Sequence, residues 1–319
     1  MTLRERLFDG AQTASIAVFL AACLVFFGLF DQAFLSVGNI LNLLRQTAPM
    51  MIVAVAMTYV ITTGGIDLSV GSQVALTNAL AAILMHAGAP WPPVVAGLLV
   101  GGALVGAVLG WFSAYQGIPS FIVTLAALTG LRGVALLLTK GYSIPIEAGP
   151  GFDALGRGSL LGLPIPAAIA ALVVVAGYVG LEWTRYGRQV TAVGANLEAA
   201  RRAGMPARRV AASVFALTGA AAALAGLIIA SRLGSGSSNA AVGFELDVIA
   251  AVVLGGTSLF GGRGTIIGTL LGALTIAVIG NGLILLHVSP FFTQIATGAI
   301  ILGAIWLNAR AFARLARAR

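Results

Sequence analysis

The chain has 319 residues, of which 59% are hydrophobic and 9% charged, and its formal net charge is +8. Soluble domains carry roughly 25% charged residues, so this composition excludes a cytosolic enzyme, a coiled coil and a disordered chain. Continuous apolar runs and a mean hydropathy of +1.02 predict an all-α, polytopic membrane protein, because helices satisfy their own backbone groups in lipid. At about 20 residues per span, ten spans and short loops fill the chain, so we expect residues 1–319 to form a single transmembrane domain.

Prolines mark the starts of several apolar runs, because proline is tolerated in the first turn of a helix and disrupts its interior. Pro49, Pro119 and Pro290 are examples. The predicted spans are residues 14–30, 49–63, 71–87, 92–113, 119–139, 164–183, 211–231, 244–258, 264–286 and 290–307.

The first run contains the only cysteine, Cys23, at the end of a segment that resembles a lipoprotein signal box. The apolar run continues to Phe30, however, and nine further spans follow it. We therefore favour an ordinary first span in which Cys23 is an apolar side chain. A single cysteine also excludes disulfides within the chain and cysteine-based metal sites.

Two glycine-rich junctions share the pattern GGxxLxxG. Residues 64–71 join the second and third spans, and residues 255–262 join the eighth and ninth. Both face the same side in a ten-span chain, which favours a parallel duplication, although two such turns can also match by chance. Glycine-rich interruptions in two halves often mark a transporter's pathway. Stripes of small residues favour close helix packing at Gly102, Gly106 and Gly110, and at Gly264, Gly268 and Gly272.

Four charged residues lie in or beside apolar runs, namely Asp67, Arg132, Glu245 and Asp247. A charge at mid-bilayer costs about 2.5–3.5 kcal/mol on insertion scales, so such groups pair or line a wet cavity. The helix rise from Pro49 places Asp67 near the cytoplasmic face, whereas a re-entrant path would place it deeper. Asp67 either bonds backbone groups freed at a break, which we favour, or lines a path. Arg132 could pair with Asp67 or with Glu245.

The remaining cations predict the orientation. Ten spans place thirteen of them on the side of both termini and four on the other, so the positive-inside rule predicts cytoplasmic termini. The thirteen are Arg4, Arg6, Arg185, Arg188, Arg201, Arg202, Arg208, Arg209, Arg263, Arg310, Arg314, Arg317 and Arg319, and the four are Arg45, Lys140, Arg157 and Arg232.

Motifs for catalysis are missing from the sequence, which has no HExxH, GxSxG or GxxxxGK[ST]. The two histidines, His86 and His287, are far apart along the chain. We therefore expect a chain that is not an enzyme and holds no metal or cofactor of its own. Any ATP would be used by another polypeptide.

The longest predicted cytoplasmic segment is residues 184–210. Asn196 is a good N-cap, Glu198 suits the positive end of the helix dipole, and Gly204 can end the helix. Residues 197–203 are therefore predicted to form a two-turn helix outside the membrane. Because so short a helix is marginal alone, it either docks on a partner or belongs to a structured loop whose arginines set the topology.

The segment Glu198-Ala199-Ala200-x3-Gly204 matches the EAA-x3-G signature of binding-protein-dependent ABC importer permeases. The wider chain resembles the monosaccharide, ribose-type branch of these permeases, in the expected order and over nearly its whole length. The segments that carry the likeness are residues 63–71, 119–125, 186–200 and 245–272.

The resemblance implies a cytoplasmic ABC ATPase that docks on a coupling helix formed by Asn196, Glu198, Ala199, Ala200 and Gly204. It also implies a periplasmic sugar-binding protein and a second permease copy or homologue. Leu197, Arg201 and Arg202 lie where family members vary, so the loop does not identify the ATPase.

The favoured function is therefore the permease subunit of an ABC importer in the bacterial inner membrane, with a monosaccharide as cargo. The alternatives are an ABC permease for a sugar-like signal or a nucleoside, an ion-coupled secondary transporter and, less favoured, an intramembrane enzyme. A neutral sugar needs hydroxyl and amide groups more than charge, and such liners include Thr62, Thr63, Asn78 and Thr124. Candidates for the path or the helix break are Gly64, Gly65, Asp67, Ser69, Gln73, Arg132 and Asn281.

Overall fold

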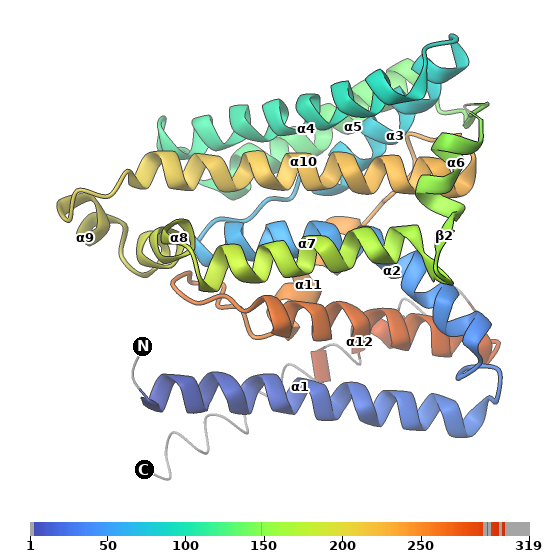
Figure 1. Ribbon diagram of the computed structural model, residues 1–319. Coiled ribbons are helices and arrows are strands. Elements are labelled where there is room, and N and C mark those ends of the chain that lie inside the picture. Colours follow the sequence, from blue (N-terminus) through green and yellow to red (C-terminus); the bar gives the residue numbers. More distant parts are fainter. Residues whose placement is uncertain (1–2, 148, 290–291, 293–294, 300–301, 304–319) are drawn as a thin grey trace.

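The computed structural model describes residues 3–147, 149–289, 292, 295–299 and 302–303, and its long helices run along one common direction (Figure 1). The helices are α1 (Leu3–Phe30), α2 (Val37–Thr62), α3 (Val70–His86), α4 (Trp91–Ala114), α5 (Ser120–Thr139), α6 (Pro150–Arg157), α7 (Ile165–Glu182), α8 (Arg185–Ala195), α9 (Leu197–Arg202), α10 (Ala207–Leu233), α11 (Phe244–Leu254) and α12 (Ile266–Leu285). The tenth predicted span, residues 290–307, lies largely outside the described residues.

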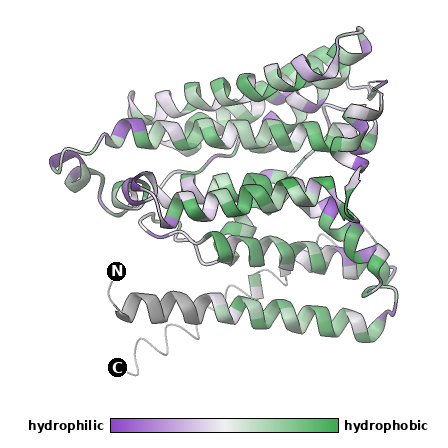
Figure 2. Ribbon diagram, in the orientation of Figure 1, coloured by the Kyte–Doolittle hydropathy of each residue, from purple (hydrophilic) through white to green (hydrophobic). Residues whose placement is uncertain are grey.

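Seven of the described helices are long and apolar enough to cross a bilayer, namely α1, α2, α4, α5, α7, α10 and α12. Hydrophobic residues cover the helix bodies, and hydrophilic residues gather toward the two ends of the bundle (Figure 2). Two predicted spans are shorter, because α3 has 17 residues and α11 has 11. At 1.5 Å per residue α11 is about 16 Å long, roughly half of a bilayer core. The chain is thus a mostly helical, multi-span membrane protein, as predicted.

The second span begins at Val37, twelve residues before the predicted start, and the prediction that Pro49 opens it was wrong. The Ser36 hydroxyl caps the helix by accepting a hydrogen bond from the Asn39 amide at 3.3 Å. Polar residues in the first three turns, among them Asn39 and Arg45, interrupt the apolar pattern there. Pro49 is buried inside α2, where packed neighbours make a proline in a membrane helix tolerable.

Short elements that the sequence did not indicate lie at the end of the bundle opposite α9. They include α6 and two small antiparallel sheets, so the all-α prediction holds only for the bundle itself. Strand β1 (Ile144–Pro145) pairs with β4 (Ser235–Gly236), and β2 (Ser159–Leu160) pairs with β3 (Leu163–Pro164). The pairing of β1 with β4 ties the segment after α5 to the segment after α10.

The centre of the bundle is α10, which packs against α4, α3 and α2. The predicted stripe of small residues on α4 faces it: a Cβ on Gly102 would lie 2.5 Å from the Gly219 carbonyl oxygen, and one on Gly106 would collide with the Phe215 carbonyl. Such spacing lets two backbones approach closely without side chains between them. This packing explains the stripe.

Replacing Gly102 with alanine is expected to lower the free energy of unfolding by about 1–3 kcal/mol, the usual cost of overpacking. Its neighbour Gly101 is the matched control, because none of the described atoms lies within 4 Å of a Cβ added there. Gly101→Ala should leave stability unchanged or raise it slightly, since alanine is the better helix former. Chemical unfolding in detergent measures both, and equal losses would contradict the packing assignment.

Candidate functional site

The first part of the site is α9, a two-turn helix held by caps at both ends. The Asn196 side-chain oxygen accepts a hydrogen bond from the Ala199 amide at 2.9 Å. At the other end Gly204 adopts a φ of 77°, and the Met205 amide donates to the Ala200 carbonyl at 3.1 Å. These two features are an N-cap and a Schellman C-cap. The predicted helix over residues 197–203 is confirmed, with Arg202 as its last residue.

The two alanines of α9 face opposite ways. Ala200 is 4% exposed and belongs to the core cluster that also contains Val193 and Val210. Ala199 is exposed, as are Glu198 and the 42% exposed Leu197. Of the two alanines assigned to the coupling helix, Ala200 packs against its own chain and Ala199 is left exposed. The small side chain of Ala200 is what lets α9 lie close to the bundle.

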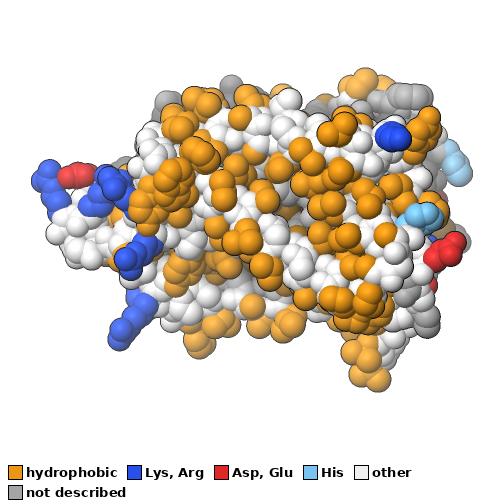
Figure 3. Space-filling model, turned by 90° about the horizontal axis from the view of Figure 1, so that it is seen from above, with side chains coloured by type: hydrophobic (Ala, Val, Ile, Leu, Met, Phe, Trp, Pro, Cys, Tyr) orange, Lys and Arg blue, Asp and Glu red, His pale blue; other side chains and the backbone are white. Residues whose placement is uncertain are grey.

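Cationic side chains gather at the end of the bundle that carries α9, around one acidic group (Figure 3). Within this group Glu198 and Arg202 form an exposed ion pair at 3.2 Å. Such a surface pair between residues i and i+4 contributes little to stability, about 0.3–0.5 kcal/mol. The loop that carries Arg263 lies at the same end, because the Gly262 amide donates to the Thr62 carbonyl at 2.8 Å. The exposed arginines of this end are Arg185, Arg188, Arg201, Arg202, Arg208, Arg209 and Arg263.

The second part of the site is an extended break over residues 63–69, between α2 and α3. The Ser120 hydroxyl accepts from the Ile66 amide at 3.0 Å, and the Thr124 hydroxyl donates to the Ile66 carbonyl at 3.2 Å. Both side chains come from the first turns of α5. They satisfy backbone groups that have no helical partner, which explains how an extended segment is tolerated beside membrane helices.

Asp67 is fully buried in this break, and the depth near the cytoplasmic face that helix rise from Pro49 suggests stays a prediction. That estimate assumed a continuous helix, whereas the chain turns back at Gly64 and Gly65 and re-enters the bundle. One Asp67 oxygen accepts from the Ser69 amide at 2.9 Å and from its hydroxyl at 2.6 Å. The Gln73 amide nitrogen in turn donates to the Ser69 hydroxyl at 2.8 Å.

A second extended break precedes α11, over residues 234–243, and Arg132 holds it. The guanidinium donates to the carbonyls of Ser238 and Ala240, each at 2.7 Å, and to that of Ala241 at 3.3 Å. In the described part of the chain these backbone groups are its hydrogen-bond partners. The predicted pairing with Asp67 or Glu245 was therefore wrong, although the Glu245 carboxylate acts on Arg132 electrostatically.

The two breaks meet where α3 and α11 begin. A Cβ on Gly71 would lie 2.9 Å from the Ala241 carbonyl and would collide with the Glu245 carboxylate. Among the described residues, three buried acceptor oxygens here have no hydrogen-bond partner: Asp67 Oδ2, Gln73 Oε1 and Glu245 Oε2. The exposed Asp247 follows two residues after Glu245. Asp67, Gln73 and Glu245 thus leave three unpaired acceptor oxygens in the interior of the described bundle.

Three glycines, Gly64, Gly194 and Gly261, bring the arginine-rich loops together around the end of α2. A Cβ on Gly194 of α8 would collide with the Thr62 carbonyl, and one on Gly261 would lie 2.9 Å from the Gly64 amide nitrogen. The two GGxxLxxG junctions therefore touch, but they are not equivalent. The first follows a long helix and enters a break, whereas the second follows the short α11. Helix α10, which leads into the break over residues 234–243, runs the opposite way to α2 (Figure 1), and the parallel duplication stays a prediction.

Other predicted residues lie apart from the breaks or support backbone. Asn281 of α12 forms a reciprocal amide pair with Asn39 of α2, with bonds of 2.8 and 3.1 Å. The Thr62 hydroxyl donates to its own helix at the Thr58 carbonyl. The Asn78 side chain accepts from the Ser237 amide at 2.6 Å. The sequence did not identify Ser120 as a residue that supports the first break. The available signal was its position in residues 119–125, one of the segments that carry the family likeness.

Replacing Asp67 with alanine is expected to lower the free energy of unfolding by about 1–2 kcal/mol, because the start of α3 loses its acceptor. Asp67→Asn keeps a carbonyl oxygen for the Ser69 amide and should retain most of that stability. Unfolding in detergent separates the two variants. If Asp67→Asn were as unstable as Asp67→Ala, the negative charge and not the cap would be the stabilising feature.

The chain is similar to known proteins over most of its length. The family described as branched-chain amino acid transport system / permease component matches residues 39–305. The ribose import permease protein of Haemophilus influenzae is 42% identical over 299 residues, covering 92% of this chain and 91% of that protein. Its Bacillus subtilis counterpart is 43% identical and covers 94% of both chains. The xylose transport system permease protein of Escherichia coli is 36% identical, covering 92% of this chain and 90% of that protein. No solved structure matches the chain.

Proposed function

This chain belongs to the family of permease components that matches it, and we propose that it is the permease subunit of an ABC importer whose cargo is a monosaccharide. It is a multi-pass protein of the bacterial inner membrane. The observation that carries the proposal is α9, a capped helix outside the spans, in a chain 42% identical to a ribose import permease. The relatives are named for the import of ribose and xylose, which favours ribose, another pentose or a hexose as cargo.

The exposed face of α9 is the docking surface for a cytoplasmic ATPase in this proposal. Leu197, Glu198 and Ala199 lie on that face, and Asn196 and Gly204 fix its ends. The chain itself would hydrolyse no ATP and would hold neither metal nor cofactor, since ATP belongs to the partner. A periplasmic binding protein would deliver the sugar, and a second permease copy or homologue would complete the path.

Motion of α9 would reach the membrane through contacts that are already close. Helix α8 leads directly into α9, and Gly194 of α8 lies against Thr62 at the end of α2. The next residues are the break with Gly64, Gly65 and Asp67. A displacement of α9 therefore has a short backbone route to the buried Asp67, Ser69 and Gln73 and, past Gly71 and Ala241, to the half-buried Arg132. We assign this cluster to the gating of the path, and Asn281 to a site apart from it.

The proposal includes ten spans with both termini in the cytoplasm and one domain over residues 1–319. The gathering of exposed arginines at the α9 end supports this orientation through the positive-inside rule. Helix α1 starts at that end as well (Figure 1). At the opposite end Lys140 follows α5, and Arg157 and Arg232 lie in the last turns of α6 and α10, where the Arg157 Nε donates to the Arg232 carbonyl at 2.9 Å.

Reconstitution tests the function. Proteoliposomes that contain this chain, together with the ATPase and binding protein encoded beside it, should accumulate labelled ribose or another monosaccharide only with internal ATP. Omitting the ATPase should abolish uptake even when a proton or sodium gradient is imposed. Uptake driven by such a gradient alone would instead support an ion-coupled transporter. Transport of a nucleoside or sugar-like signal, with no sugar transported, would keep the ABC class and change the cargo.

A further inference from the structure

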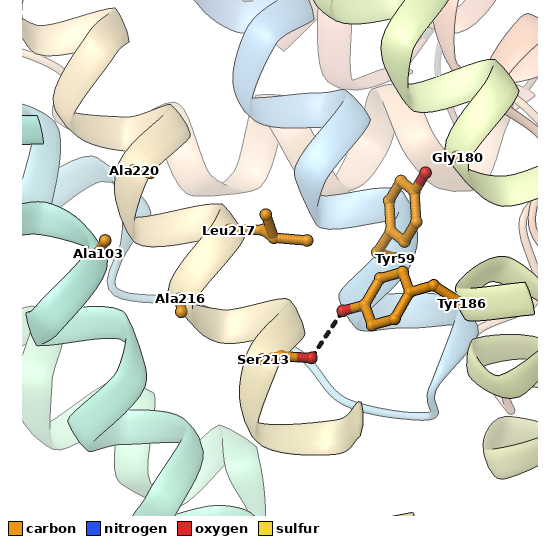
Figure 4. A pocket seen from close by; sticks show the side chains of 8 residues that line it. All are labelled: Tyr59, Ala103, Gly180, Tyr186, Ser213, Ala216, Leu217 and Ala220. Carbon is orange, nitrogen blue, oxygen red and sulfur yellow. Dashed lines mark hydrogen bonds between the residues drawn. The ribbon is translucent and has the colours of Figure 1, made fainter. Parts of the chain in front are cut away.

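A groove of about 550 Å³ lies along α10, apart from both breaks. Its sides are Ser213, Ala216, Leu217 and Ala220 of α10, facing Tyr59 and Tyr186. Leu217 points across the groove toward the Tyr59 ring (Figure 4), and its side chain is 47% exposed. The volume lies within the range of pockets that hold small ligands, about 300–1,000 Å³.

The polar atoms of the groove are already paired, which argues against a sugar as the ligand. The Tyr59 hydroxyl donates to the Gly177 carbonyl at 2.6 Å. The Tyr186 and Ser213 hydroxyls bond each other at 2.7 Å (Figure 4). The two tyrosine rings also stack, with centroids 6.2 Å apart. A polyhydroxylated ligand would find few free partners, whereas a hydrocarbon chain needs none.

The groove begins in the half of the membrane next to the arginine-rich end. At 1.5 Å per residue, Ser213 and Ala220 lie about 9 and 20 Å from the start of α10, so the groove reaches about the middle of a bilayer core of about 30 Å. Trp183, at the end of α7, is 73% exposed near the same level. Exposed tryptophan is typical of the interface between hydrocarbon and headgroups.

An arginine-lined hollow of about 470 Å³ lies at the start of the same helix, at the arginine-rich end of the bundle. Its lining includes Tyr115, Arg201, Arg208 and Arg209. Arg209 lies one turn before Ser213 on α10, so positions 209, 213, 216 and 220 share one face of the helix. The cationic hollow and the apolar groove thus lie one after the other along α10. A lipid molecule has the same order, with a headgroup at the membrane surface and acyl chains deeper in the bilayer.

We propose that this groove binds an anionic phospholipid, with an acyl chain between α10 and Tyr59 and the phosphate held by Arg208 and Arg209. The charge of the hollow complements the phosphate, and basic pockets between membrane helices bind such headgroups. The arginine fork matches phosphate geometry. Because α10 is the central helix of the bundle, the bound lipid would be in contact with the element against which α4 and α2 pack. The inference does not depend on which cargo the chain carries.

Lipid retention tests the proposal. The full-length chain is purified in mild detergent, equilibrated with equimolar phosphatidylglycerol and phosphatidylcholine, and examined by native mass spectrometry. The wild type should retain phosphatidylglycerol at least tenfold in preference to phosphatidylcholine. Ala220→Phe, which fills the groove, should lose at least tenfold of the bound lipid. Arg208→Gln with Arg209→Gln should abolish the preference for phosphatidylglycerol while some lipid of both kinds remains.

Matched controls use the same substitutions elsewhere. Ala96→Phe places a ring at an exposed alanine on α4, and Arg188→Gln removes an exposed arginine of α8 that lines neither hollow. Both should bind lipid like the wild type. Equal retention by all variants would overturn the proposal. So would disulfide-linked dimers of Leu217→Cys in a Cys23→Ser background, because a second copy would then cover the groove. Size-exclusion profiles identify any variant that fails to fold. The Arg208→Gln with Arg209→Gln variant is expected to fold, because both arginines are exposed.

Discussion

Replacing Arg132 with leucine is expected to lower the free energy of unfolding by about 3–5 kcal/mol, the usual cost of leaving buried polar groups without a charged partner. Three carbonyls of the second break, at Ser238, Ala240 and Ala241, would lose their donor. In lipid no water replaces it. The equilibrium constant for folding should therefore fall roughly a hundred- to several-thousand-fold.

The geometry of the guanidinium predicts a graded series. Arg132→Lys keeps the charge but offers one compact ammonium in place of a planar fork, so it should restore part of the stability. Arg188→Leu, an exposed arginine on α8, should change the unfolding free energy by less than about 0.5 kcal/mol. Unfolding in detergent, followed by tryptophan fluorescence, measures all three. If Arg132→Leu were as stable as Arg188→Leu, the backbone of residues 238–241 would not depend on this side chain.

Local signals predicted α9 almost to the residue. Its N-cap, its acidic first turn and its terminal glycine all act within four residues of the chain, so they are visible in sequence. Asn196 and Gly204 make the bonds that their residue types indicate. The opposite orientation of Ala199 and Ala200 was not predictable, because it depends on packing against distant residues such as Val210.

The membrane breaks show where sequence patterns stop being informative. The residues that stabilise the first break are separated from it by 54 and 58 positions, at Ser120 and Thr124. The Arg132 contacts span 106 to 109 positions. Hydrophobic periodicity reports only the faces of one helix. The apolar runs predicted as the spans 49–63 and 244–258 therefore did not reveal the re-entrant path of Asp67 or the short helix α11.

The start of α2 was mispredicted for two reasons, the proline at position 49 and the polar residues before it. A rule that holds in water, proline at the start of a helix, fails when neighbouring helices satisfy the freed carbonyl. Polar residues of the first turns, such as Asn39, are accommodated by pairing with Asn281 of α12. The reciprocal amide pair thus accounts both for the early start of the span and for the place of Asn281 outside the breaks.

Replacing Ala199 with tryptophan is expected to reduce ATP-dependent sugar uptake at least a hundredfold and to leave the fold intact. Ala199 is exposed at the end of the bundle, so a ring there meets little of its own chain, and the unfolding free energy should change by less than about 0.5 kcal/mol. A cleft of the ATPase shaped for a small side chain would exclude the ring. Uptake and ATP hydrolysis by the reconstituted complex, beside unfolding of the isolated chain, measure both effects.

Its neighbour provides the informative contrast. Ala200→Trp places the same ring in the core cluster, where overpacking should cost about 1–3 kcal/mol and detach α9 from its own chain. Ala96→Trp, exposed on α4, should alter neither stability nor uptake. Loss of uptake without loss of stability therefore distinguishes a docking surface from a structural one. Normal uptake by the Ala199→Trp complex would show that the exposed face of α9 does not contact the ATPase. Binding of sugar by the periplasmic partner should be unchanged in either case.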